Sequence, residues 1–227
     1  MDKHRAEGNF FITPDIMEDF PEVVSLVASR GHEIGLCCDY RNSGCPASLI
    51  SFKDELEKLI GRKSSGCMLK CGANEGPFRL KNLAVTGFSY VLPDFNPVSH
   101  HYPPRPFNAV FGEGLSMMVF PVSYYSVLGV RVLFGMAGKL RLYPYWFLRF
   151  CIRFYGARGI PAVINFPLWE FDPYLPRQAL SFLDRLRSYG NLSLAELKLT
   201  RLLLEFDFGR VNHLTVSEVY KSQKQST

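Results

Sequence analysis

The sequence lacks a long apolar run, a dense set of metal-ligating residues and any block of like charges. Its 227 residues include five histidines and six cysteines. The opening residues, MDKHRAEG, are polar, so they do not predict a cleavable secretory leader. The uncharged stretch 114–130 is broken by Pro121 and falls short of the roughly 20 apolar residues of a spanning helix. We therefore expect no transmembrane segment, and the absence of a disulfide framework favours the cytoplasm.

The net charge of the chain is small and evenly spread. Its 26 Lys and Arg against 21 Asp and Glu give +5, and the basic residues are scattered among the acids. This pattern argues against a nucleic-acid partner and leaves only a mild attraction to acidic glycans or a membrane surface. A hydrophobic content of 47% in 227 residues predicts one domain over 1–227, with a polar tail at 221–227.

The stretch from Asn9 to Arg41 predicts a strand, a helix and a second strand. Residues 9–13 form an aromatic and β-branched run, and Thr13-Pro14 is typical of a capped helix start. Pro21 should restart the helix, Gly31 should end it, and residues 33–38 form the next strand. Two apolar strands joined by a helix are the unit of a parallel sheet or barrel covered by helices.

Later in the chain, periodic apolar residues predict three further helices and a strand. The helices are expected at 51–60, at 145–155 and at 194–206, the last beginning with a capping box at Ser193. The strand is expected at 161–166. The side chains predicted to face the core are Phe52, Leu56, Leu59 and Ile60, then Phe147, Phe150, Cys151 and Phe154, and then Leu199, Leu202, Leu203 and Phe206.

The phrase Gly31-His32-Glu33-Ile34-Gly35, following Phe10-Phe11, resembles the NodB-type polysaccharide deacetylases of carbohydrate esterase family 4. Residues 119–123 (VFPVS), 140–145 (LRLYPY) and 169–173 (WEFDP) resemble the exopolysaccharide- and exosortase-associated branch of that family. The resemblance implies an α/β fold, an incomplete (β/α) barrel without its first strand, in which residues 1–8 are a remnant of the first helix. The open edge beside Phe10-Phe11 would then be covered by the tail, a protein partner or a missing segment.

The positions that carry catalysis in the resembled family are substituted here. Its metal-binding histidine pair falls at Cys37 and Arg41, and an arginine cannot ligate a metal. Its base-orienting arginine falls at Met68, and its acid histidine falls at Pro167, or at Phe166 if the register slips by one. The resemblance therefore implies no catalytic residue, no metal and no cofactor. The remnant cleft is expected near Cys37, Arg41, Met68, Trp169 and Glu170.

Several residues admit a second interpretation. The cysteines at 37, 38, 45, 67 and 71 have a loose spacing for zinc, and reduced thiols in strands and loops are the favoured alternative. The adjacent His100 and His101 are better read as loop residues facing solvent. Trp169 is either a core residue, which is favoured, or a platform on which a sugar stacks.

The leading hypothesis is a polysaccharide deacetylase-like protein of surface or exopolysaccharide metabolism that is catalytically inactive and binds a polysaccharide, an oligosaccharide or a protein partner. The alternative is an active metal-dependent hydrolase that removes N- or O-acetyl groups, with its site completed by an upstream segment. A decayed gene product without a selected function is a third interpretation.

Overall fold

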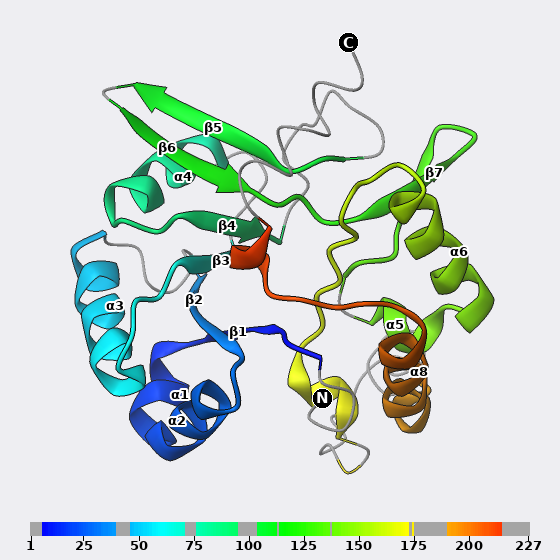
Figure 1. The fold of residues 1–227 in the computed structure, drawn as a ribbon, viewed down its shortest axis with the longest axis horizontal. Helices are drawn as coiled ribbons and strands as arrows, with labels where there is room; N and C mark the ends of the chain where they lie inside the picture. The colour runs from blue at the N-terminus through cyan, green and yellow to red at the C-terminus, as the bar shows by residue number, and fades with distance from the viewer. Residues whose placement is uncertain are drawn as a thin grey trace, which may run out of the picture. The chain divides into compact units, whose positions relative to one another are not determined.

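The computed structural model describes residues 6–39, 46–70, 76–94, 104–112, 114–136, 138–172, 174 and 190–214 (Figure 1). The chain forms two compact units. Unit 1 comprises residues 1–99, 106–121 and 208–227, and unit 2 comprises residues 100–105 and 122–207. The single domain expected over 1–227 stays a prediction.

Unit 1 is built on a six-stranded sheet with the order β1-β2-β3-β4-β6-β5. Strands β1 to β4 and β6 run parallel, and β5 pairs antiparallel with β6. The strands are β1 (Asn9–Ile12), β2 (Glu33–Asp39), β3 (Gly66–Lys70), β4 (Tyr90–Pro93), β5 (Phe107–Gly112) and β6 (Leu115–Val119). The helices are α1 (Pro14–Asp19), α2 (Pro21–Ser29), α3 (Pro46–Ile60) and α4 (Gly76–Val85).

The predicted strand-helix-strand unit is confirmed. Each of α1 and α2 begins with a proline, which needs no hydrogen-bond acceptor for its nitrogen at the first helical position. The Thr13 hydroxyl makes no capping hydrogen bond, so the proline alone marks this start. Gly31 has a φ of +85°, the left-handed conformation that ends the helix. The chain then returns so that Asn9 pairs in parallel with Glu33.

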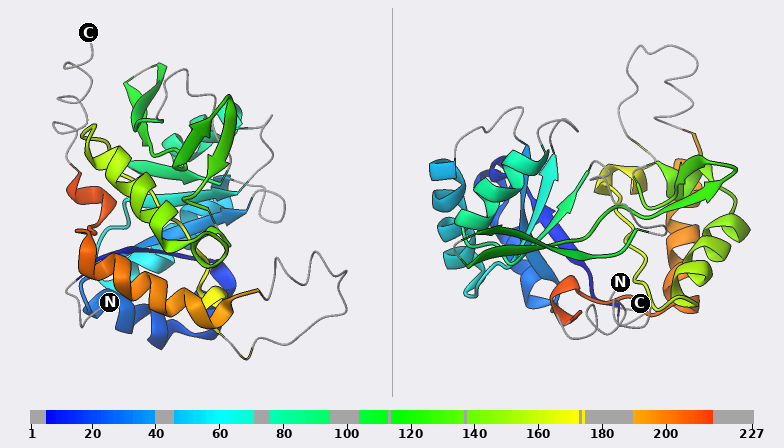
Figure 2. Two further views of the ribbon diagram at one scale, coloured as in Figure 1. Left: turned by 90° about the vertical axis from the view of Figure 1, so that its right-hand side faces the viewer. Right: turned by 90° about the horizontal axis from the view of Figure 1, so that it is seen from above.

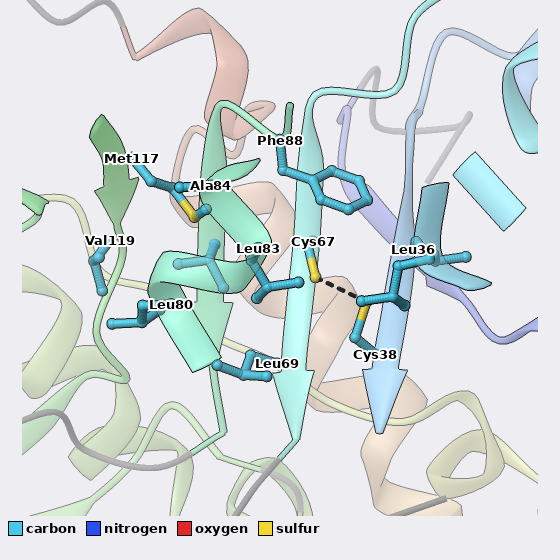
Figure 3. Close-up of a cluster of buried hydrophobic side chains, with 12 residues drawn as sticks. Leu36, Cys38, Cys67, Leu69, Leu80, Leu83, Ala84, Phe88, Met117 and Val119 are labelled. Carbon is cyan, nitrogen blue, oxygen red and sulfur yellow. Dashed lines mark hydrogen bonds between the residues drawn. The ribbon is translucent and has the colours of Figure 1, made fainter. Parts of the chain in front are cut away.

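The helices of unit 1 pack on one face of its sheet (Figure 2). Leu36 and Cys38 of β2 point to this face and meet side chains of α3 and α4 in the larger cluster (Figure 3). Ile34 lies on the same face and meets α1, α2 and α3 in the second cluster. The core-facing side of the predicted helix 51–60 is confirmed, since Leu56 is fully buried there. The helix itself starts earlier, at Pro46.

Unit 2 contains a hairpin and several helices. Its elements are β7 (Tyr124–Val127), β8 (Val130–Leu133), α5 (Lys139–Leu142), α6 (Tyr145–Gly156), η3 (Leu168–Phe171) and α8 (Leu192–Glu205), and η4 (Val211–His213) follows in unit 1. Helices near 145–155 and 194–206 were predicted and are present as α6 and α8.

Two predictions for unit 2 are wrong. Residues 161–166 form no strand, because two of their amides bond elsewhere than to a strand ladder: Val163 N to Ser123 Oγ at 2.8 Å and Asn165 N to Gly135 O at 2.8 Å. The capping box at Ser193 does not form, since α8 already begins at Leu192 after a left-handed Asn191.

The α/β class and the incomplete (β/α) barrel are the fold of this chain. A parallel sheet has its helices on one face, as in a barrel wall, and among the described residues the sheet ends at β1 and β5 instead of closing. Within the described part of the chain, no helix has both the length and the apolar character needed to cross a bilayer.

Candidate functional site

The face of the unit 1 sheet away from the helices carries the first predicted site residues. Cys37 of β2 pairs in register with Met68 of β3. Two residues further toward the carboxyl ends of the strands, Asp39 pairs with Lys70. Register partners on parallel strands point to the same face, so the thiol and the thioether are neighbours. Carboxyl ends of parallel strands are where ligands bind in α/β sheets. Two of the five predicted cleft residues therefore lie together in the expected place.

The chemistry available at this position is limited. Cys37 is 5% exposed, and burial raises the pKa of its thiol, an effect that the Lys70 ammonium partly opposes. A thiol whose pKa is raised is a poorer nucleophile at neutral pH than an ordinary cysteine. Met68 is buried and offers only a thioether. Arg41 lies outside the described residues, as do Cys45, Cys71, His100 and His101.

A metal centre finds no support in the part of the chain that the structure covers. No group of three or more His, Cys, Asp or Glu side chains suitable for a metal ion occurs among the described residues. Cys38 and Cys67 lie with their sulfurs 3.2 Å apart, but on the helix-covered face, within the hydrophobic cluster (Figure 3). Burial raises the pKa of the Cys67 thiol, so this pair is a packing feature of the core. Of the two positions that the resemblance assigns to the metal-binding histidine pair, only Cys37 lies among the described residues, and the absence of a metal stays a prediction.

Unit 2 holds the other two predicted residues, in the short helix η3. Glu170 is fully buried, and its Oε2 lies 3.4 Å from Nε of Arg141, which is itself only 1% exposed. Glu170 Oε1 also accepts a hydrogen bond from the Gly138 amide. Burial raises the pKa of Glu170, against the lowering effects of the Gly138 amide and of Arg141. The carboxylate is occupied inside the protein and presents no oxygen to a ligand.

Trp169 stays partly accessible. Its side chain is 40% exposed, and one face of its ring carries the Arg141 guanidinium 5.2 Å from the centroid. Arg141 Nη1 donates to Gly190 O at 2.8 Å, which fixes the cation beneath the ring. Trp169 is thus a half-exposed ring that contacts a buried ion pair, and its role as a core residue or a sugar platform stays a prediction. Sequence reasoning did not identify Arg141, because nothing within the short helix KLRL marks its pairing with Glu170.

The Gly-His-Glu-Ile-Gly phrase is placed at the amino ends of the strands, where it packs the sheet. A Cβ on Gly35 would lie 2.6 Å from Gly66 O and 2.8 Å from the Phe11 ring, so glycine is required for close strand approach. Glu33 Oε2 accepts from Asn9 Nδ2 at 2.7 Å, and Asn9 Nδ2 also donates to the Tyr90 hydroxyl at 2.5 Å. His32 Nδ1 accepts from Gly8 N at 3.3 Å. The phrase therefore acts structurally in this chain.

Residues 210 and 211, near the C-terminus, contact the segment that carries the Asn9–Glu33–Tyr90 cluster. Val211 N donates to Asn9 Oδ1 at 3.0 Å, and Arg210 pairs with Glu7 at 2.8 Å. Burial raises the pKa of Glu33, and its hydrogen bonds to Tyr90 and Asn9 oppose this. The amino end of a barrel-type sheet is the end associated with stability, which agrees with this network of packed hydrogen bonds.

The described strands and helices define the class of fold: an α/β chain with an incomplete (β/α) barrel. The crystal structure of PuuE allantoinase matches with a TM-score of 0.57 at 14% identity, over 97% of this chain and 68% of that one. A Mycobacterium smegmatis protein described as a polysaccharide deacetylase matches with a TM-score of 0.57 at 16% identity, over 99% of this chain and 74% of that one. At such identities the likeness establishes the fold alone.

The chain belongs to the family described as domain of unknown function DUF3473, which matches residues 96–216. That range includes the hairpin, α6, η3 and α8. No curated protein matches the chain at a significant level.

Proposed function

We propose that this chain is a polysaccharide deacetylase-like protein of surface or exopolysaccharide metabolism that binds a glycan, or a protein partner of glycan metabolism, without hydrolysing it. We place it in the cytoplasm. The observation that carries the proposal is the pairing of Cys37 with Met68 at the carboxyl end of the sheet. Deacetylation by this fold needs a polarised carbonyl and groups that transfer protons. A protonated thiol beside a thioether supplies neither function.

Trp169 is the residue that we assign to glycan contact. Aromatic rings stack on the apolar faces of sugars, and a ring whose back face is fixed by a cation is already oriented for this. The ring is 40% exposed, so one part of it is available to a ligand while Arg141 and Glu170 hold it from within. Glu170 acts through Arg141 and Trp169 as a positioning residue.

Bound metal is the first quantity to measure. The purified chain is incubated with zinc, desalted and assayed for metal by mass spectrometry, and acetate release from acetylated oligosaccharides is followed with and without chelator. We expect near-zero metal and no chelator-sensitive acetate release. One tightly held metal per chain together with chelator-sensitive acetate release would overturn the proposal in favour of the active metal-dependent hydrolase.

Glycan binding is tested with the two tryptophans of the chain as reporters. In a Trp146→Phe variant, quenching or shift of the remaining Trp169 fluorescence on titration with acetylated oligosaccharides reports contact at the proposed ring. Trp169→Ala should weaken binding about tenfold, the scale of one lost aromatic contact. Trp146→Ala is the matched control and should leave the affinity unchanged. Equal losses from both variants would place the glycan elsewhere, and no binding to any glycan would leave the partner-binding form of the proposal.

A further inference from the structure

The even spread of charge expected for the whole sequence does not hold in one stretch of the chain. Between Glu113 and Glu170 the sequence has six Lys or Arg residues and no Asp or Glu. The whole chain has 26 basic and 21 acidic residues, so 20 basic and 21 acidic residues remain elsewhere. The entire excess of positive charge therefore lies in 114–169, the stretch that forms the β7–β8 hairpin and α6.

The hairpin ends in an exposed aliphatic tip. Leu128 is 100% exposed, and Val127 and Val130 beside it are 44% and 64% exposed. Leu128 has a φ of +48° and Gly129 a φ of +83°. A two-residue turn with positive φ at both positions favours Asn-Gly, because a leucine there is strained by its backbone. Leu128 thus costs backbone energy and gains no packing within the protein, which points to a contact outside it.

The outer side of α6 adds aromatic rings and arginines. Trp146, Arg149, Phe150 and Arg153 follow the i, i+3, i+4, i+7 spacing of one helical stripe. Trp146 is 69% and Phe150 46% exposed, and the two arginine side chains are 44% and 57% exposed. The prediction that Phe150 faces the core was wrong. The helix buries Leu148, Cys151, Ile152 and Tyr155, since the stretch is apolar on more than one face.

Aromatic contacts join the hairpin to α6. The Tyr125 ring of β7 packs edge-on against Phe150 and Phe154 of α6, with centroids 5.2 and 5.0 Å apart. Arg158 lies over Phe154 at 3.6 Å from the ring centroid. Arg149 and Arg153 both pair with the Glu205 carboxylate, whose pKa is lowered by Arg149, Tyr145 and Arg153, so among the described residues two cations share one anion.

We propose that the hairpin tip (residues 127–130) and the α6 stripe (Trp146, Arg149, Phe150 and Arg153) bind the surface of an anionic lipid bilayer. Aliphatic and aromatic side chains bordered by arginines suit the headgroup boundary, where apolar groups enter the acyl region and guanidinium groups meet lipid phosphates. A glycan would not account for the tip, because three aliphatic side chains offer a sugar no hydrogen bond and no ring to stack on. The binding is peripheral, with the tip and rings inserted to headgroup depth.

Vesicle sedimentation tests the proposal with the full chain. One set of vesicles contains phosphatidylcholine alone, and the other contains equimolar phosphatidylcholine and phosphatidylglycerol. We expect sedimentation with the anionic vesicles only, weakened by salt. A Trp169→Phe variant leaves Trp146 as the sole tryptophan, and its emission should shift to the blue on binding.

Matched variants locate the contact. Leu128→Asp removes one inserted side chain and should reduce vesicle binding about tenfold or more. Arg153→Gln should reduce binding to anionic vesicles about fivefold. Leu204→Asp makes the same change at a leucine of α8 that is 72% exposed, and it should have no effect. Melting temperatures of all variants should stay near that of the wild type, because the altered side chains are exposed.

Four results would overturn the proposal. The first is equal binding to neutral and anionic vesicles, and the second is no sedimentation with either. The third is an equal loss in Leu128→Asp and Leu204→Asp. The fourth is self-association of the wild-type chain that Leu128→Asp abolishes, which would assign the tip to a contact between two copies of the chain.

Discussion

Replacing Glu170 by glutamine would leave the Arg141 guanidinium buried without its carboxylate. The two side chains are 0% and 1% exposed, so water cannot replace the lost charge. Arg141 would retain its hydrogen bond to Gly190 O and the face of Trp169, and the glutamine oxygen could still accept from the Gly138 amide. The loss is thus confined to the ion pair itself.

Removing one partner of a buried ion pair costs about 3–5 kcal/mol, and we expect Glu170→Gln to fall near the lower end because these other contacts remain. Urea denaturation followed by circular dichroism measures the change in the free energy of unfolding. Combining Glu170→Gln with Arg141→Met gives up the Gly190 hydrogen bond and the Trp169 contact but removes the stranded charge, and it should recover part of the loss because an uncompensated buried charge is the larger penalty. The double variant should therefore be more stable than Glu170→Gln alone.

A cost below about 1 kcal/mol for Glu170→Gln, the range of exposed pairs, would show that the Arg141–Glu170 pair does not behave as a buried ion pair. Strict additivity of the two substitutions would refute the reasoning, because coupled partners give non-additive changes. Glu205→Gln is the control, since its arginine partners are exposed to solvent and its effect should be clearly smaller.

Three further predictions concern unit 1 and the cysteines. Burial raises the pKa of Glu33 above its usual 4.5. The contribution of Glu33 to the free energy of unfolding should therefore fall as pH rises from 4.5 through the raised pKa. Glu33→Gln should flatten this slope in denaturation curves measured across pH. Gly35→Ala should cost about 1–3 kcal/mol in urea titrations through overpacking, whereas Gly156→Ala, with nothing within 4 Å of its new Cβ, should be neutral or stabilising. In the native chain, no more than two of the six cysteines should react quickly with a thiol reagent, whereas all six should react in denaturant. Mass spectrometry should find that the protected cysteines are the buried ones, Cys37, Cys38, Cys67 and Cys151. Fast native labelling of Cys37 would contradict its burial.

Local signals predicted the elements of the fold well. Helix starts and ends are set by nearby residues, here Pro14, Pro21 and Gly31. The elements α1, α2 and β2 could therefore be predicted from the sequence. The prediction of a strand at 161–166 was wrong because it rested on apolar character, which indicates burial. A strand also needs a neighbouring strand whose backbone groups are free to pair with it. Those amides find Ser123 and Gly135 instead.

The candidate site was only half predictable for a similar reason. Glu170 was selected from a motif, but its partner Arg141 comes from a different helix and carries no local mark of the pairing. The Asn9–Glu33–Tyr90 cluster joins three separate strands, and its members were not singled out for chemistry. Contacts between distant segments depend on the tertiary arrangement, which periodicity alone does not encode.

The return of the chain from unit 2 to unit 1 has a consequence for biosynthesis. Asn9 and Val211 are 202 positions apart, yet they share a hydrogen bond. The ribosome synthesises residues in order, so β1 lacks its contact with Val211 until all of unit 2 has been synthesised. During that interval the Asn9 side chain lacks its hydrogen bond from Val211, and Glu7 lacks its ion pair with Arg210. The slow step in maturation should thus be the late docking of residues 208–214 onto the rest of unit 1.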